Sequence, residues 1–464
     1  MAKKKKGIWR IVDNFQGDKI IWMIVLLLIM ISILAISSST PLLALQTGST
    51  RSAIINEQIV ISMLGLGVII FCYAFIRKVR LLQVLSQLGF AVSLAMLLCL
   101  AVEIRLPFLK AVRINGAVRI LQVMGFQLHV FEFVKVFMVM YLAWACQAYK
   151  EGDFTIARIL SERPHFQFLK KKSWQLFFYV FLPIFTVMLL TVKGSVSSTL
   201  FTGLIMFATI LVGGIRFREF LIYLVIGLPL AVGVIAVSYF QYDESKAADN
   251  KGSFLDRIPT AINRIVRSTQ DPEEQLLQYR PGSPEFQAVL DMVKQPISAK
   301  VAVSEGGFFG KGPGRSTQRY VVPVMFEDYM FSFIVEEYGI LGALLVIILY
   351  GTLLARGSII ASNCTTLFAK TAVAGLIIAI SGQALMHMFI NVDLGPLTGQ
   401  TLPMISHGAS SFLAFSLAFG IILCISKMVK KKVDREVARM KPIIEERDDV
   451  RDGLSDLEQL ESME

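Results

Sequence analysis

Residues 20–39 read IIWMIVLLLIMISILAISSS, a run without a single charged side chain. About 20 consecutive apolar residues make a helix that crosses the hydrocarbon core of a bilayer. The run is too long for a removable signal peptide, and no convincing small-residue cleavage site follows it. It therefore predicts a membrane-spanning helix near the start of the chain.

The composition extends this prediction to the whole protein. The 464 residues are 55% hydrophobic and only 17% charged, with a mean hydropathy of +0.62. Soluble globular proteins usually carry about 25% charged residues. We therefore expect an all-α polytopic membrane protein with about ten transmembrane helices. The apolar runs centre on residues 20–39, 57–76, 82–101, 128–148, 174–192, 197–215, 218–239, 329–352, 367–390 and 409–427.

The basic residues predict the orientation of these spans. The formal charge of +11 gathers in short loops, such as KKKK at 3–6 and KKK at 170–172 and 430–432. Lys and Arg concentrate in cytoplasmic loops, so this charge indicates topology and gives no reason to expect nucleic acid. Both termini are then cytoplasmic. The predicted organisation is a basic N-terminus (1–19), a ten-span domain (20–427) and a charged tail (428–464). A large extracytoplasmic loop (241–327) joins spans seven and eight.

The cysteines and histidines predict neither a disulfide framework nor a zinc site. All five cysteines lie within apolar runs without paired spacing, and the four histidines form no HExxH pattern. The cysteines are Cys72, Cys99, Cys146, Cys364 and Cys424.

Carboxylates near the eighth span are the first candidates for chemistry, because ionisable residues within a membrane are costly. Asp328 lies at the predicted outer end of this span, and Glu336-Glu337 follow in the same run. On one helix, Asp328 and Glu336 would be about 80° apart, so both could face one cavity. Asp328 could equally be a carboxylate favoured by the helix macrodipole.

The fourth span carries the second candidate group. Glu132 and Lys135 are three residues apart, and Arg119 precedes the span on the outer side. The pair could simply neutralise itself on one helix face. It could instead offer a cation, held by a carboxylate, to an anionic head group.

Two glycine-rich segments are candidate site walls. The loop between spans nine and ten carries Ser406 and Ser410 among tight-turn residues, and irregular backbone near a membrane lines a cavity or packs on protein. The segment GGFFGKGPGRST at 306–317 supplies Lys311 and Arg315. It lacks the spacing of a phosphate-binding nucleotide loop, so we expect no nucleotide.

Four blocks of sequence resemble the SEDS proteins, the FtsW/RodA/SpoVE family of peptidoglycan polymerases, over nearly the whole chain. They are GAVR at 116–119 with Glu132 and Lys135, GKGPGRSTQ at 310–318, DYMFSFIVEEYGILG at 328–342, and PLTGQTLPMISHGASS at 396–411. The opening GDKIIW resembles the division members, FtsW, more than the elongation members, RodA. The sequence departs from the family pattern at Ile120, His407 and Ala409, and it has Lys193-Gly194-Ser195 where relatives carry an aspartate.

The resemblance implies a glycosyltransferase that polymerises lipid II during septal cell-wall synthesis. It implies Asp328 as the catalytic base, and a divalent cation, Mg or Mn, could assist at the pyrophosphate. It also implies a class B penicillin-binding transpeptidase and divisome membrane proteins as partners, at the division septum of a bacterial inner membrane. The substrate contacts would be Arg119, Glu132, Lys135, Lys311, Arg315, Glu336, Ser406 and Ser410. An elongation-type polymerase, a flippase for lipid-linked precursors and a non-catalytic divisome scaffold are the alternatives.

Overall fold

The computed structural model describes residues 17–114, 117–223, 225, 277–322, 325–395 and 398–432. Within these ranges, eight helices are long and apolar enough to cross a membrane, which makes the chain a multi-pass membrane protein. They are α2 (Lys19–Ser39), α4 (Arg51–Phe75), α5 (Val79–Ala101), α6 (Val130–Glu151), the continuous helix Lys172–Val192, α16 (Met330–Ser362), α17 (Leu367–Asn391) and the C-terminal helix Ala409–Lys432. The helix Lys172–Val192 consists of α8 (Lys172–Leu176), η2 (Phe177–Phe181) and α9 (Leu182–Val192).

Nine of the ten predicted apolar runs fall on helices of the structure. The sixth run is the shorter apolar helix α10 (Val196–Val212). The seventh, 218–239, lies mostly outside the described residues, as do most of the predicted loop 241–327 and the chain beyond 432. The remaining helices are α3 (Pro41–Thr47), α7 (Thr155–Ser161), η1 (Pro164–Lys170), α15 (Pro284–Gly306) and η4 (Gln318–Tyr320).

A four-stranded antiparallel sheet between α5 and α6 departs from the all-α prediction. Its strands are β1 (Arg105–Leu106), β2 (Leu109–Ile114), β3 (Ala117–Val123) and β4 (Phe126–His129), in the order β1-β2-β3-β4. The sequence between β2 and β3 reads Asn-Gly, a strong signal for a two-residue hairpin turn. Hydropathy alone missed the sheet because its strands are too short to form an apolar run.

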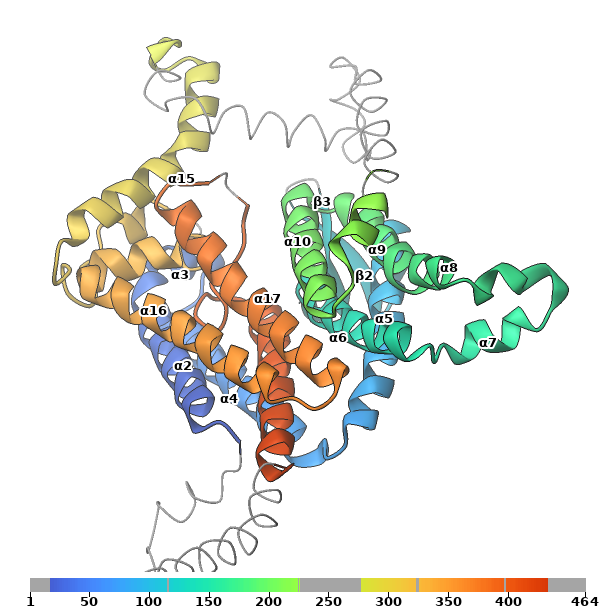
Figure 1. Ribbon diagram of the computed structural model, residues 1–464. Coiled ribbons are helices and arrows are strands. Elements are labelled where there is room, and N and C mark those ends of the chain that lie inside the picture. The colour runs from blue at the N-terminus through green and yellow to red at the C-terminus, as the bar shows by residue number, and fades with distance from the viewer. Residues whose placement is uncertain are drawn as a thin grey trace, which may run out of the picture.

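The helices pack as two groups that share α6 and α10. One apolar core joins mainly α2, α4, α6, α16, α17 and the C-terminal helix, with part of α10, and the other joins mainly α5, α6, α9, α10 and the sheet. Figure 1 shows α16 and α17 on one side of the molecule and α5, α8 and α9 on the other. Because α6 and α10 pack on α17, the residues of these three helices can meet where the two groups join.

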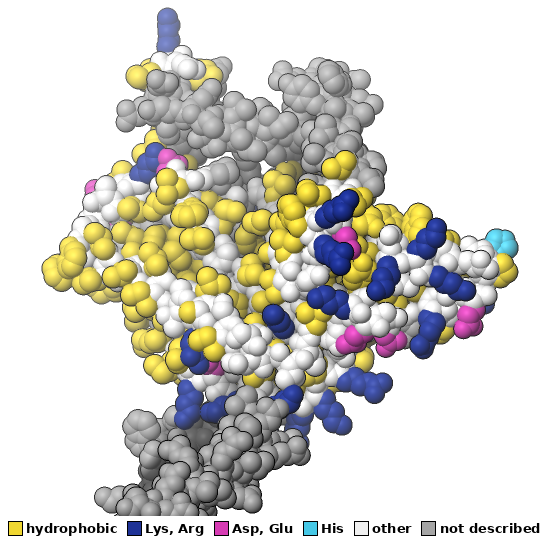
Figure 2. Space-filling view, viewed as in Figure 1, with side chains coloured by type: hydrophobic (Ala, Val, Ile, Leu, Met, Phe, Trp, Pro, Cys, Tyr) yellow, Lys and Arg dark blue, Asp and Glu magenta, His cyan; other side chains and the backbone are white. Residues whose placement is uncertain are grey.

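The two ends of the described chain lie together at one end of the bundle. The backbone N–H of Asp18 donates to Ser426 Oγ over 2.9 Å, and Arg356 binds the Asp18 carboxylate. Figure 2 shows an apolar surface over the helices on the left of the view, with Lys and Arg side chains along the lower edge and over the region of α7 and α8 on the right. An apolar belt with basic side chains gathered away from it is the pattern expected for a membrane protein.

Helix α16 is broken at Gly339, where the backbone has φ 68° and ψ −165°. The 307–312 segment occupies the break. The N–H groups of Lys311 and Gly312 donate to the carbonyls of Glu336 and Glu337, each over 2.9 Å. Ile340 N–H donates to the Gly307 carbonyl over 3.0 Å. The glycine-rich segment thus satisfies backbone groups that a broken helix would otherwise leave unpaired in lipid.

Candidate functional site

Asp328 lies in a turn, residues 325–329, immediately before α16 begins. Three hydrogen bonds clamp the backbone of this turn. Asn391 Nδ2 donates to the Asp328 carbonyl over 3.0 Å, Ser406 Oγ donates to the Glu327 carbonyl over 2.7 Å, and His407 N–H donates to the Phe326 carbonyl over 2.9 Å. The position of the Asp328 carboxylate is therefore set by α17 and by the loop before the C-terminal helix.

The protein around Asp328 raises the pKa of its carboxyl group above the value it has in water. Burial raises its pKa to about 6, against the opposing charge of Arg119. Burial, and then the charge of Asp328, raises the pKa of neighbouring Glu327 to about 7. A half-buried carboxylate that titrates near neutral pH can accept a proton and release it again. Gly399 borders the carboxylate, since a Cβ at that residue would lie 3.6 Å from Asp328 Oδ2.

The sheet carries Arg119, the cation whose charge acts on the Asp328 carboxylate. Arg119 lies in β3, and its Nε donates to the Gly194 carbonyl over 2.8 Å, which fixes the guanidinium beside the α9–α10 loop. Desolvation lowers the pKa of His129, at the end of β4; the charge of Glu132 opposes this shift and the charge of Arg119 adds to it. Arg119, His129, Glu132 and Asp328 therefore form one electrostatically connected group.

Lys135 is the centre of a buried polar network instead of an open binding group. Its side chain is 3% exposed, and its ammonium donates to Glu132 Oε1 over 2.9 Å, to Gln400 Oε1 over 3.2 Å and to Gln383 Oε1. An ammonium has three N–H donors, and all three are used. Glu132 retains one buried oxygen, Oε2, without a partner among the described residues. The predicted pair is thus real, but a substrate contact by Lys135 would require one of these bonds to open.

Helix α17 links this network to Asp328 through residues that the sequence analysis did not select. Gln383, His387 and Asn391 are spaced by four residues and lie on one helix face. His387 Nδ1 donates to the Gln400 carbonyl over 2.7 Å, and Nε2 accepts from Phe331 N–H over 3.3 Å, so a ring protonated on Nδ1 alone satisfies both contacts. A polar stripe within an apolar span was visible in the sequence and could have identified them.

Glu336 belongs to a second cluster, with the glycine-rich segment. Its carboxylate is fully buried and accepts from Lys311 Nζ over 2.8 Å, from Thr317 N–H over 2.8 Å and from Ser316 Oγ. The expectation that Glu336 shares a cavity with Asp328 is therefore wrong, because Asp328 precedes the helix and the angular argument does not apply. Although burial opposes it, hydrogen bonding to Glu305 and Glu336 raises the pKa of Lys311, which stays charged within this cluster.

Glu337, the next residue of α16, belongs to the same cluster. It accepts from Ser38 Oγ over 2.6 Å and from Gly314 N–H over 2.9 Å, and the Arg319 guanidinium lies 3.8 Å from it. These contacts join α2, α16 and the 311–319 segment. Arg315, also predicted to bind substrate, is exposed on this segment.

The two predicted serines hold loops together. Ser406 Oγ, besides its bond to the Glu327 carbonyl, accepts from Leu402 N–H over 2.9 Å. Ser410 Oγ donates to the Gln127 carbonyl in β4 over 2.7 Å. Each hydroxyl has a single proton, and both protons are donated to backbone carbonyls, so neither is free to donate to a substrate. Their role in the structure is to place the 398–411 loop against the Asp328 turn and the sheet.

The described part of the chain offers no group of three or more His, Cys, Asp or Glu side chains suited to a metal ion. Glu327 and Asp328 are adjacent carboxylates, but no third ligand of this kind joins them, so these residues do not make a complete protein metal site.

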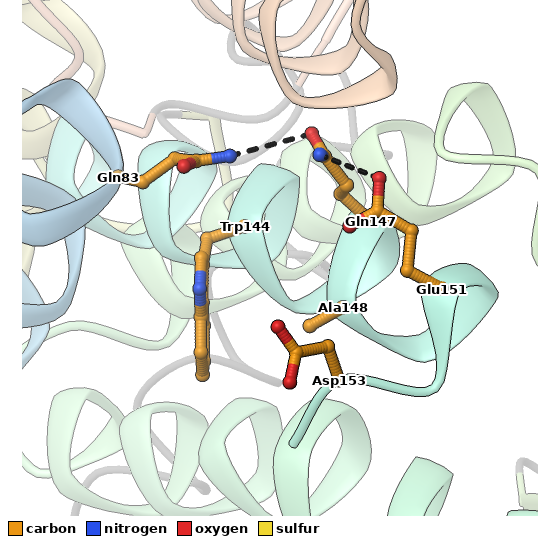
Figure 3. A pocket seen from close by; sticks show the side chains of 6 residues that line it. All are labelled: Gln83, Trp144, Gln147, Ala148, Glu151 and Asp153. Atoms are coloured by element: carbon orange, nitrogen blue, oxygen red, sulfur yellow. Dashed lines mark hydrogen bonds between the residues drawn. The ribbon is translucent and has the colours of Figure 1, made fainter. Parts of the chain in front are cut away.

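A small pocket lies elsewhere, near the end of α6. Gln83, Trp144, Gln147, Ala148, Glu151 and Asp153 line it (Figure 3). Gln147 donates to Glu151 over 2.7 Å and accepts from Phe368 N–H over 2.9 Å. The amide therefore ties α6 to the start of α17, and the pocket contains none of the predicted site residues.

The sequence matches a known protein family and several of its members. The family described as cell cycle protein, FTSW_RODA_SPOVE, matches residues 18–261 and 284–431. A probable peptidoglycan glycosyltransferase FtsW of Caulobacter vibrioides is 26% identical over 327 residues, covering 70% of this chain and 69% of the relative. A protein of the same name from Enterococcus hirae is 27% identical over 446 residues, covering 92% and 97%.

A solved structure has the same fold. It is described as "Structural coordination of polymerization and crosslinking by a peptidoglycan synthase complex". It aligns with a TM-score of 0.60 at 20% identity, over 89% of this chain and 98% of the other.

Proposed function

Because the chain belongs to the FtsW/RodA/SpoVE family, we propose that it is an FtsW-like peptidoglycan glycosyltransferase that polymerises lipid II into glycan strands. The observation that carries the proposal is the Asp328 carboxylate, clamped beside Arg119 with a pKa raised to about 6. The reaction joins an acceptor hydroxyl to the anomeric carbon of a donor sugar, and a polyprenyl pyrophosphate leaves.

Asp328 acts in this proposal as the general base. Its carboxylate takes the proton of the attacking hydroxyl as the new glycosidic bond forms and the bond to the pyrophosphate breaks. Arg119 neutralises charge that develops on the departing pyrophosphate, which is the usual role of a guanidinium at such a site. Arg315 is a second candidate cation for the substrate. Glu132 and Lys135 do not contact the sugar in this proposal; their hydrogen bonds hold α6 against α17 beside the site.

The experiment compares Asp328→Asn with Glu327→Gln in the purified protein supplied with labelled lipid II. An amide of nearly the same shape cannot accept the proton, so Asp328→Asn should lose at least about 10²-fold in polymerisation. Glu327→Gln removes a neighbouring negative charge and should be far milder. Polymerisation by Asp328→Asn at close to the wild-type rate would show that Asp328 is not the base.

The same assay separates a polymerase from a flippase or a scaffold, and a vesicle flipping assay separates the flippase from the scaffold. A flippase or a scaffold would produce no glycan from lipid II, whether or not a partner is added. We further propose that a class B penicillin-binding transpeptidase and divisome membrane proteins bind this chain, and that a divalent cation assists at the pyrophosphate. Addition of a chelator to the assay tests the cation.

The proposed location is the division septum of the bacterial inner membrane, with both termini in the cytoplasm. A fluorescent fusion should concentrate at midcell late in the cell cycle, and depletion should give filaments. Dispersed lateral signal and rounded cells would instead indicate an elongation-type RodA polymerase.

A further inference from the structure

Four large apolar side chains project from one end of the sheet, and we call them the apolar tip: Leu106, Phe108, Met124 and Phe126. They are 53%, 72%, 75% and 79% exposed. The β1–β2 and β3–β4 turns lie side by side, because Met124 N–H donates to the Phe108 carbonyl over 3.0 Å. The tip is thus one continuous patch, and such patches on a protein surface usually contact something other than water.

The backbone conformation of the tip disfavours a large apolar residue at position 124, yet a methionine is found there. Met124 and Gly125 both have positive φ, 48° and 93°, the geometry of a tight hairpin turn between Val123 and Phe126. Asn or Asp is the usual first residue of such a turn, because a larger side chain is strained at positive φ. The chain instead places a methionine there and exposes it.

The tip continues the lipid-facing surface of α5. Along that helix, Val92 and Leu98 are exposed by 48% and 47%, and Val102, just beyond its end, by 76%. Leu121 in β3 packs in the same core cluster as Leu97 and Leu100 of α5. The sheet therefore lies against the last turns of a membrane span, and Figure 1 shows β2 and β3 at the height of α9 and α10 instead of above them.

Two cations flank the tip in a way that favours an anionic surface. Arg105 and Lys110 are directly opposite each other in the β1–β2 pair, and both are exposed. Like charges in this register repel each other. Phosphate groups of lipids would relieve the repulsion, and long basic side chains can reach such head groups while apolar neighbours enter the acyl region.

We propose that the apolar tip inserts into the bilayer leaflet around the sheet-bearing end of α5, with Arg105 and Lys110 on the lipid phosphates. The tip then anchors the sheet that carries Arg119, five residues from Met124 in the chain. This membrane anchor does not depend on the proposed enzymatic activity.

The test places a tryptophan in the tip and measures its contact with lipid. Full-length Phe108→Trp and Met124→Trp proteins are reconstituted in vesicles of phosphatidylglycerol and phosphatidylethanolamine, with or without brominated acyl chains. Their emission is compared with that of the parent, which already contains four tryptophans. The control is Tyr279→Trp, a 39% exposed position just before α15, whose start rises away from the bundle in Figure 1.

Brominated lipid should quench the added emission at both tip positions and leave the control unaffected, while aqueous iodide should quench only the control. Tip tryptophans that respond to iodide and not to brominated lipid would overturn the proposal. Protection from both quenchers would also overturn it, because a second copy of the chain would then cover the tip. In the Met124→Trp background, Arg105→Gln with Lys110→Gln should weaken quenching in anionic vesicles, and unchanged quenching would remove the cations from the anchor.

Discussion

Replacement of Lys135 by methionine tests whether the buried network around this residue holds the protein together. Methionine keeps the length of the side chain and removes the ammonium, so Glu132 loses its cation, and two amide oxygens lose a donor. Breaking a buried ion pair by removing one partner costs about 3–5 kcal/mol. This is a large part of the roughly 5–15 kcal/mol by which a folded protein is stable.

The purified protein in detergent should therefore melt about 6–10 °C lower for Lys135→Met, taking about 2 °C per kcal/mol. Adding Glu132→Gln should recover about 2 kcal/mol of the loss, because the neutral amide no longer needs a cation. Lys150→Met, at the exposed end of the same helix, is the control and should change stability by no more than about 0.5 kcal/mol. If Lys135→Met has the same melting temperature as Lys150→Met and loses only activity, the buried network does not stabilise the protein and Lys135 binds substrate.

Two further predictions concern pH and the break in α16. Polymerisation should be lost as the pH falls through about 6, because Asp328 must be deprotonated to act as a base, and a rate that stays flat from pH 5 to 8 would contradict this role. Gly339→Ala should cost several kcal/mol and lower the yield of folded protein, because its Cβ would lie 2.3 Å from the Phe308 carbonyl oxygen at a φ of +68°. Gly351→Ala, within the same helix with open space around it, should be neutral or stabilise by up to about 1 kcal/mol, and equal melting of the two variants would refute the strain argument.

The sequence predicted most of the membrane architecture, because a span in lipid must satisfy its backbone hydrogen bonds within its own helix. A run such as 20–39 must be helical whatever its neighbours are. The same reasoning selected the Glu132–Lys135 pair, which the structure confirms as a buried ion pair. Blocks of sequence that resemble a known family identified that family, which the comparisons confirm.

Hydropathy could not place the sheet or the partners of the polar side chains. The strands from 105 to 129 are short, and their order follows from hairpin geometry, which leaves little trace in a hydropathy profile. Glu336 and Asp328 are eight residues apart, and helical periodicity put them on one surface. The start of α16 at Met330 leaves Asp328 outside the helix, so its side chain follows the turn instead.

The sequence by itself determined that this chain crosses the membrane many times and which ionisable groups need partners. Only the tertiary structure decided which partners they receive. Lys135 meets Gln383 and Gln400, 248 and 265 residues away, and Glu336 meets Lys311 across a break that a single glycine permits. Local pattern fixes the cost of a buried charge, but the atoms that offset the cost come from distant segments, and their approach depends on how the helices pack.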